Sequence, residues 1–231
     1  MARRKSLSKP SLSALVTKLS PKSVISEQYR TVRTNIQFSF VDKDLMSLMV
    51  TSAGPNEGKS TVTANLAIVF AQQGKKVLLV DADMRKPTLQ YLFRLDNRSG
   101  LSNILVGDSQ LEDTARQTGI DNLDVLTCGP IPPNPSELLG SKMMESLLQQ
   151  ANEQYDLVIF DTPPVLAVAD PQVLANICDA SIMVIRSKQT EYDTAQKAKD
   201  LLLPAKAKLI GTILNDRDQK KSNYYYYYGN K

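Results

Sequence analysis

The stretch LMSLMVTSAGPNEGKSTVTANLAIVFAQQGK, residues 45–75, decides the fold. It opens with a short apolar run, residues 45–51, which predicts a buried strand. Residues 52–59 then predict a loop, and residues 60–73 predict an amphipathic helix that Gly74 closes. A strand, a glycine-containing loop and a helix in this order are the setting of a phosphate-binding loop, because the N–H groups at a helix N-terminus point toward phosphate oxygens.

The loop itself matches the Walker A pattern of a phosphate-binding loop (P-loop). In that pattern Lys59 reaches the β- and γ-phosphates, and the Ser60 hydroxyl binds Mg²⁺. The departure is Ala53, where the general pattern has glycine, and an alanine methyl is tolerated there when its φ is negative. An ordinary glycine-rich turn would not explain Gly-Lys-Ser at the start of a helix. We therefore expect ATP and Mg²⁺ to bind at Ala53, Gly54, Pro55, Asn56, Glu57, Gly58, Lys59, Ser60 and Thr61.

Further apolar runs of strand length recur outward from this unit, separated mostly by segments with helical patterning. They cover residues 77–80, 123–126, 157–160, 181–185 and 209–214. Alternating strands and helices predict a mainly parallel sheet that helices cover on both faces. The expected fold class is therefore α/β, with three layers.

Two of these runs end in aspartates. Residues 77–80 lead into Asp81-Ala82-Asp83-Met84-Arg85, and residues 157–160 lead into Asp161. Ligands in open parallel sheets bind beyond the carboxyl ends of the strands, so these carboxylates should converge on the P-loop. A lone aspartate at a strand end could simply cap the next helix. Three at one edge favour a magnesium site, with Asp161 as the Walker B residue that holds the ion through water.

The two ends of the chain differ in composition from its centre. Residues 1–22 are rich in Ser, Lys and Pro and predict a basic, flexible arm, and Ser26 is expected to cap a helix that ends near Phe40. Residues 23–215 form the predicted P-loop domain, and residues 216–231 form a flexible, tyrosine-rich tail. Six basic residues precede the first acidic one. Without them 22 basic residues face 24 acidic ones, so the net charge of +4 belongs to the arm, and nucleic-acid binding by the domain is not expected.

The composition also excludes several kinds of chemistry. The chain has no histidine, which removes an imidazole base, a His-ligated metal and the His-Arg-Asp loop of eukaryotic-type kinases. Its two cysteines, Cys128 and Cys178, are far apart and predict neither a disulfide framework nor a zinc site. No apolar run approaches the roughly 20 residues that a membrane span needs. A cytoplasmic protein fits these features best.

The combined motifs resemble those of bacterial tyrosine kinases. The doublet Asp81-x-Asp83-x-Arg85, the P-loop and Asp161 match the Walker A′, A and B motifs of that family, which accepts Ala53. Glu27-x-x-Arg30-x-x-Arg33 precedes the P-loop, as it does in the family. The resemblance runs from about Ser26 to the end of the chain and is to the capsular and exopolysaccharide kinases of Gram-positive bacteria. Its last feature is a run of tyrosines: Tyr224, Tyr225, Tyr226, Tyr227 and Tyr228.

This resemblance implies an ATP-dependent protein-tyrosine kinase that phosphorylates its own tyrosine cluster between subunits. It assigns Asp83 as the base for the acceptor and Asp81 to the metal-bound water. Arg85 orients Asp83 or the acceptor, although a structural ion pair is an equal alternative. Asn215 resembles the asparagine that binds the adenine base in related ATPases, and Arg217 would stack nearby.

The resemblance also implies partners. Glu27, Arg30 and Arg33 lie three residues apart on one helical face, which without the resemblance would predict only a solvated charged surface. In the family this motif joins subunits into a closed ring, an octamer. A transmembrane activator resembling polysaccharide co-polymerases recruits the kinase to the inner face of the membrane, and a cognate protein-tyrosine phosphatase opposes it.

Two alternatives remain open at this stage. The first is a partitioning or division-site ATPase, which carries a signature lysine near the start of its P-loop, where this chain has Gly54. The second is a nucleotide-gated scaffold of a polysaccharide export complex. The five adjacent tyrosines argue against both, because neither function needs such acceptors.

Overall fold

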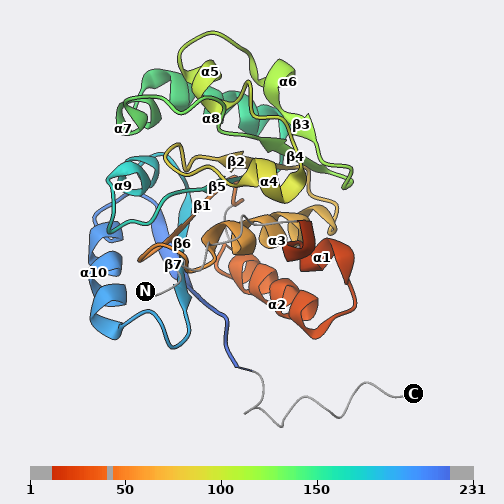
Figure 1. The fold of residues 1–231 in the computed structure, drawn as a ribbon, viewed down its shortest axis with the longest axis vertical. Helices are drawn as coiled ribbons and strands as arrows, with labels where there is room; N and C mark the ends of the chain where they lie inside the picture. Colours follow the sequence, from red (N-terminus) through yellow and green to blue (C-terminus); the bar gives the residue numbers. More distant parts are fainter. Residues whose placement is uncertain (1–11, 41–43, 219–231) are drawn as a thin grey trace, which may run out of the picture.

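A computed structural model describes residues 12–40 and 44–218, and within them seven strands form one sheet in the order β3-β4-β2-β5-β1-β6-β7 (Figure 1). Neighbouring strands run parallel, except that β3 is antiparallel to β4. The strands are β1 (Ser47–Ser52), β2 (Val77–Asp81), β3 (Arg116–Gln117), β4 (Leu123–Leu126), β5 (Leu157–Asp161), β6 (Ala180–Arg186) and β7 (Lys208–Asn215).

The predicted mainly parallel sheet is confirmed. Each of the six predicted strands begins within two residues of its expected start, because each coincides with a run of mostly apolar residues. The missed strand is β3, whose two residues are exposed at the edge of the sheet and carry no apolar pattern.

Helices cover both faces of the sheet, as predicted (Figure 1). On the face that carries Leu48 and Val50 of β1, α3 packs against the sheet, and α1, α2 and α4 pack against α3; on the other face α5 to α10 lie on the side of Met49. No helix in the described ranges has the length and apolar character to span a bilayer. The helices are α1 (Val16–Leu19), α2 (Val24–Phe38), α3 (Lys59–Ala71), α4 (Leu89–Phe93), α5 (Leu101–Leu105), α6 (Leu111–Thr114), α7 (Pro135–Leu139), α8 (Lys142–Gln154), α9 (Asp170–Leu174) and α10 (Tyr192–Leu202).

The segment before α2 differs from the flexible arm expected for residues 1–22. Leu15 and Thr17 are fully buried. The Asn65 side chain of α3 accepts hydrogen bonds from Thr17 N at 3.0 Å and Thr17 Oγ1 at 2.8 Å, and it donates to Ala14 O at 2.8 Å. Residues 12–22 therefore belong to the folded domain, because polar side chains of α3 bind their backbone. The rest of the expected arm lies outside the described residues.

The helix that begins with the P-loop is also more buried than an amphipathic helix. Ten consecutive residues of α3, 62–71, are buried, because α1 and α2 cover the side that faces away from the sheet. The N-cap of α2 is Ser23 rather than the expected Ser26, and its hydroxyl accepts a hydrogen bond from Ser26 N at 3.2 Å. Ser26 is buried inside the first turn, so it could not act as the cap.

Candidate active site

The P-loop, residues 53–61, connects β1 to α3. Gly58 and Asn56 have φ values of +86° and +63°, which turn the chain sharply into the helix. A Cβ atom at Gly58 would lie 2.2 Å from Asn215 Nδ2, so only glycine fits there. Ala53 is fully buried and its φ is not positive, so the alanine that departs from the general pattern is accommodated without strain.

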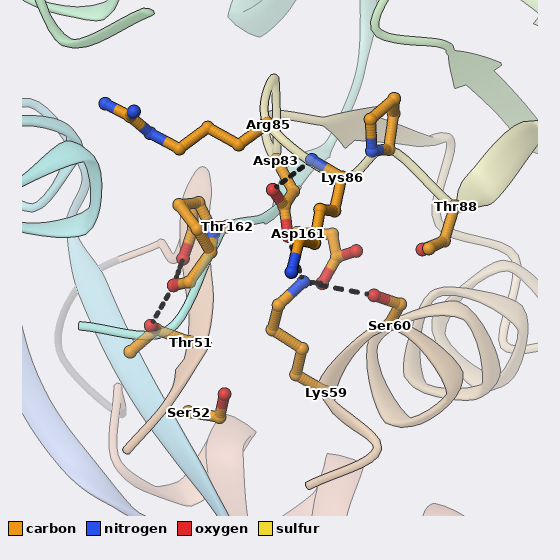
Figure 2. A network of polar contacts seen from close by, with 12 residues as sticks. Thr51, Ser52, Lys59, Ser60, Asp83, Arg85, Lys86, Thr88, Asp161 and Thr162 are labelled. Carbon is orange, nitrogen blue, oxygen red and sulfur yellow. Dashed lines mark hydrogen bonds and ion pairs between the residues drawn. The ribbon is translucent and has the colours of Figure 1, made fainter. Parts of the chain in front are cut away.

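Lys59 lies among acidic side chains from two neighbouring strand ends (Figure 2). Its Nζ is 2.9 Å from Asp83 Oδ2, 3.5 Å from Asp161 Oδ1 and 3.2 Å from Ser60 Oγ. Burial alone would lower the pKa of Lys59, but the charges of Asp161 and Asp83 outweigh burial and raise it above its ordinary value. Lys59 is therefore a fixed cation beyond the carboxyl ends of β1, β2 and β5.

Asp81 and Asp161 are opposite each other in the pairing of β2 with β5, and both are fully buried. Burial, followed by the charge of Asp161, raises the pKa of Asp81 to about 8. Burial also raises the pKa of Asp161, against the lowering effect of Lys59. Asp81 Oδ2 accepts hydrogen bonds from Thr88 N and Leu89 N, both at 2.9 Å. In the described chain, Asp81 Oδ1 and Asp161 Oδ2 remain buried without a hydrogen-bond partner.

These unpartnered carboxylate oxygens fit a hard cation. Mg²⁺ prefers oxygen ligands and commonly takes one or two carboxylates together with phosphate oxygens and water. Residues 12–40 and 44–218 contain no group of three His, Cys, Asp or Glu side chains that could hold a metal by themselves. That donor set suits an ion that arrives with a nucleotide, at Asp81, Asp161 and Ser60.

Arg85 points away from this cluster (Figure 2). Its Nε and Nη2 contact the two carboxylate oxygens of Asp170 at 2.9 and 3.0 Å. Ser136 Oγ donates to Asp170 Oδ1 at 2.5 Å, and Asp170 is fully buried. Of the two roles left open for Arg85, the ion pair is the one that the geometry supports. The pair fixes the turn that carries Asp83, whose Oδ1 accepts from Lys86 N at 3.0 Å.

At the other end of the P-loop, Asn215 lies beside the loop. Asn215 Nδ2 donates to Glu57 O at 2.9 Å. Arg217 is exposed beyond the end of β7. Arg186, which the sequence did not single out, reaches the loop instead: its Nη1 donates to Asn56 O at 3.1 Å, and its Nη2 lies 2.7 Å from Asp216 Oδ2.

Glu57 is a buried acid inside the phosphate-binding loop. Its Oε2 accepts a hydrogen bond from Gly54 N at 3.0 Å, and its Oε1 accepts one from the Thr190 hydroxyl. Thr190 Oγ1 also accepts from Arg186 N at 2.9 Å. The loop after β6 therefore holds the P-loop in shape, and Glu57 contributes through its side chain rather than only through its backbone.

The three members of the Glu27 motif do not share one environment. Glu27 and Arg30 form an ion pair on the surface of α2. Arg33 turns toward α3, where its Nη1 donates to Val69 O at 2.7 Å, near the C-terminal end of that helix. Helix C-termini leave carbonyl groups unpaired and attract cations. Arg33 therefore caps the C-terminal end of the P-loop helix. The sequence predicted instead that Arg33 faces outward with Glu27 and Arg30.

Replacing Arg33 by alanine is expected to lower the melting temperature of the protein. Losing a charge-assisted hydrogen bond at the end of α3 should cost about 1–2 kcal/mol, or roughly 3–6 °C for a chain of this size. Glu27→Ala is the matched control, because an exposed ion pair contributes little. Calorimetry at protein concentrations too low for self-association measures the melting temperatures of both variants. If Arg33→Ala melts at the same temperature as the unaltered protein, Arg33 does not stabilise α3 and acts only at the surface.

The fold and this site together define a P-loop nucleotide-binding protein of the α/β class. A family model described as an AAA domain matches residues 53–204. Tyrosine-protein kinase YwqD of Bacillus subtilis is 53% identical over 231 residues, covering 100% of this chain and 98% of that protein. The chain belongs to the bacterial tyrosine-protein kinases of the capsule and exopolysaccharide type. The family expected from the motifs, and with it the predicted enzyme class, is confirmed.

Solved structures agree with this assignment. The chimerical protein CapA2B2 is 44% identical, with a TM-score of 0.85 over 89% of this chain and 91% of that one. The kinase domain of the Escherichia coli tyrosine kinase ETK is 35% identical, with a TM-score of 0.86 over 100% and 88%. The fold implies nucleotide binding. Because this chain is similar to a tyrosine kinase along its full length, tyrosine-kinase activity is favoured over the function of a partitioning ATPase or of a scaffold.

Proposed function

We propose that this kinase transfers the γ-phosphate of ATP to tyrosines 224–228 of another copy of itself, and that this modification regulates the synthesis and export of a capsular polysaccharide or exopolysaccharide. The observation that carries the proposal is the contact of Lys59 Nζ with Asp83 Oδ2 at 2.9 Å inside a P-loop site. It joins a phosphate-binding cation to a carboxylate that can accept a proton. The tyrosine cluster itself lies outside the described residues.

The P-loop residues bind the phosphates of ATP. Backbone N–H groups near the start of α3 and the Lys59 ammonium would face the negative charge, as in such loops generally. Asp81, Asp161 and Ser60 would hold Mg²⁺, which neutralises charge on the phosphates when bound. Asn215 is the proposed contact for the base; one N–H of its Nδ2 is bonded to Glu57 O, which leaves the second N–H and Oδ1 for this contact.

Asp83 is the proposed base. A tyrosine hydroxyl has a pKa of about 10, so its proton needs an acceptor as transfer proceeds. The phenol oxygen bonds to the γ-phosphorus while the bond from that phosphorus to the β-bridging oxygen breaks; the phenol proton passes to Asp83, and ADP leaves. Asp83 is 4% exposed and held by Lys86 N, so it keeps one orientation for this step.

Self-association and recruitment complete the proposal. Glu27 and Arg30, exposed on α2, are the residues offered to a neighbouring subunit in a ring, which a head-to-tail contact can close as an octamer. Binding to a transmembrane activator would place this ring at the cytoplasmic face of the membrane, and a protein-tyrosine phosphatase would reverse the modification. Arg33 contributes to this surface only by fixing α2 to α3.

The acceptor is tested by replacing all five tyrosines, 224–228, with phenylalanine. Autophosphorylation should fall to near zero, because the ring hydroxyls are the proposed acceptors, while nucleotide affinity stays within about twofold. Mass mapping after incubation with Mg-ATP, with calorimetric titration of ADP, measures both quantities. A variant that incorporates as much phosphate as the parent would show that the acceptors are elsewhere.

A further inference from the structure

A pocket of about 470 Å³ lies next to the candidate active site and outside its cluster of charges. One wall is the turn 85–91, which follows Asp83, and the other is residues 129–131 with Asn97. The volume is in the range of pockets that enclose small ligands or side chains. Lys59 and the three aspartates of the site do not line it, so an occupant would lie beside the reacting groups.

The walls of this pocket combine apolar surface with positive charge. Pro87, Pro130 and Ile131 line it together with the ring of Tyr91, and Ile131 is 61% exposed. Arg85 and Lys86 line it as well, and among residues 12–40 and 44–218 no acidic residue does. Apolar walls suit an aromatic ring, and a positive rim suits an anionic group.

The polar groups that line the pocket differ in whether they already have a partner. The Arg85 guanidinium is held through Nε and Nη2 by the buried Asp170, and its side chain remains 41% exposed. In the described ranges, Lys86 has no ion-pair partner, and Thr88 Oγ1 and Gln90 Oε1 are buried without a hydrogen-bond partner. Gln90 is only 8% exposed. Thr88 and Gln90, which line the pocket, therefore each have a hydrogen-bonding atom still unused.

The same turn carries the carboxylates of the active site. Lys86 N donates to Asp83 Oδ1 at 3.0 Å, and Thr88 N donates to Asp81 Oδ2 at 2.9 Å. A peptide with one residue bound in the pocket would therefore run beside Asp83, because Lys86 both lines the pocket and contacts that carboxylate.

We propose that this pocket binds phosphotyrosine, and that its occupant is an already modified tyrosine in the 224–228 cluster of a second copy of this chain. The proposal rests on the proposed autophosphorylation. Bound in this way, the first phosphotyrosine holds an adjacent tyrosine at Asp83 and Lys59. Phosphates would then be added to one tail in succession, which gives the five adjacent tyrosines a purpose.

Charge decides between the modified and the unmodified tail. Residues 219–231 contain Lys220, Lys221 and Lys231 and no acidic side chain, so the unmodified segment is positive and is repelled by Lys86. A phosphate adds about −1.5 to −2 charges and three acceptor oxygens. Phosphorylation therefore converts a repelled segment into one that matches the rim.

Fluorescence anisotropy with labelled peptides of residues 219–231 tests this directly. The full chain with tyrosines 224–228 replaced by phenylalanine is titrated with the unmodified peptide, with a peptide phosphorylated at Tyr226, and with one that carries phosphoserine there. The phosphotyrosine peptide should bind at least about tenfold more tightly than the other two, as expected for one charge-assisted hydrogen bond and an enclosed ring.

Three variants of that chain locate the site. Lys86→Ala and Ile131→Ala should each weaken binding of the phosphotyrosine peptide by about tenfold, and Lys197→Ala, an exposed lysine of α10, should not. Equal affinities for the three peptides, or affinities that Lys86→Ala and Ile131→Ala leave unchanged, overturn the proposal. Because no phosphate is transferred, this result does not depend on the kinase assay, in which failure of the proposed function would be seen.

Discussion

Lys59→Met is expected to lower tyrosine phosphorylation by about a thousandfold or more, because it removes the only P-loop cation beside the γ-phosphate. The ammonium lies between Asp83 and Asp161, and no other lysine or arginine of the described chain forms an ion pair with either. Transfer from ATP spreads negative charge over the phosphoryl oxygens, so the loss is felt in the transition state. Radiolabel from ATP on the purified chain measures it.

The control for this variant is Lys197→Met, which removes an exposed lysine of α10 and should leave the rate unchanged. The melting temperature of Lys59→Met must also be recorded, because two buried carboxylates lose their counter-charge and breaking such a pair is destabilising. If a folded Lys59→Met chain, purified from contaminating kinase, still contains phosphotyrosine, the proposed kinase mechanism is wrong.

Most of the fold could be predicted because the central strands β1, β2 and β5 are buried on both faces. Residues 77–80 and 157–160 are unbroken apolar runs that end in aspartate, a pattern that fixes both a parallel sheet and its functional edge. Strand β3 could not be predicted, because two exposed residues leave no period. The packing of residues 12–22 was missed because it depends on Asn65 and Gln72, and their tertiary hydrogen bonds give no local signal.

The site residues that could be predicted are those whose positions follow from their spacing along the chain. Lys59, Asp83 and Asp161 follow strand ends, and strand order alone brings them together. The partners of Arg85 were not predictable, because Asp170 and Ser136 lie in the first turns of two short helices, α9 and α7, in other parts of the chain. Glu27, Arg30 and Arg33 are equally spaced, so the helical period predicted one face for all three. The period does not give the depth of burial of each side chain, and so it did not show that Arg33 caps α3.

The direction of transfer follows from where the tail begins. Asp216 and Asp218 pair with Arg186 and Lys188 beside β7, at the edge of the sheet. Four strand steps separate β7 from β2, which is about 19 Å at roughly 4.8 Å per step. The six residues from Asp218 to Tyr224 span at most about 20–22 Å when fully extended. For Tyr224, the first of the five tyrosines, nothing is left for the reversal that presentation to its own Asp83 requires, so the active site of a neighbouring subunit is the better site for this tyrosine.

Mixing two complementary variants should therefore produce phosphate on the inactive partner. One chain carries Lys59→Met and keeps its five tyrosines; the other keeps Lys59 and has phenylalanine at 224–228. Neither should be labelled alone, and in the mixture the Lys59→Met chain should gain phosphotyrosine at a rate that rises with protein concentration. Adding Glu27→Ala and Arg30→Ala to both chains should slow this transfer strongly, because the proposed contact between subunits is lost. If the Lys59→Met chain stays unmodified while the unaltered enzyme labels itself at a rate independent of dilution, transfer occurs within one subunit, and Glu27 and Arg30 are left as a solvated surface pair.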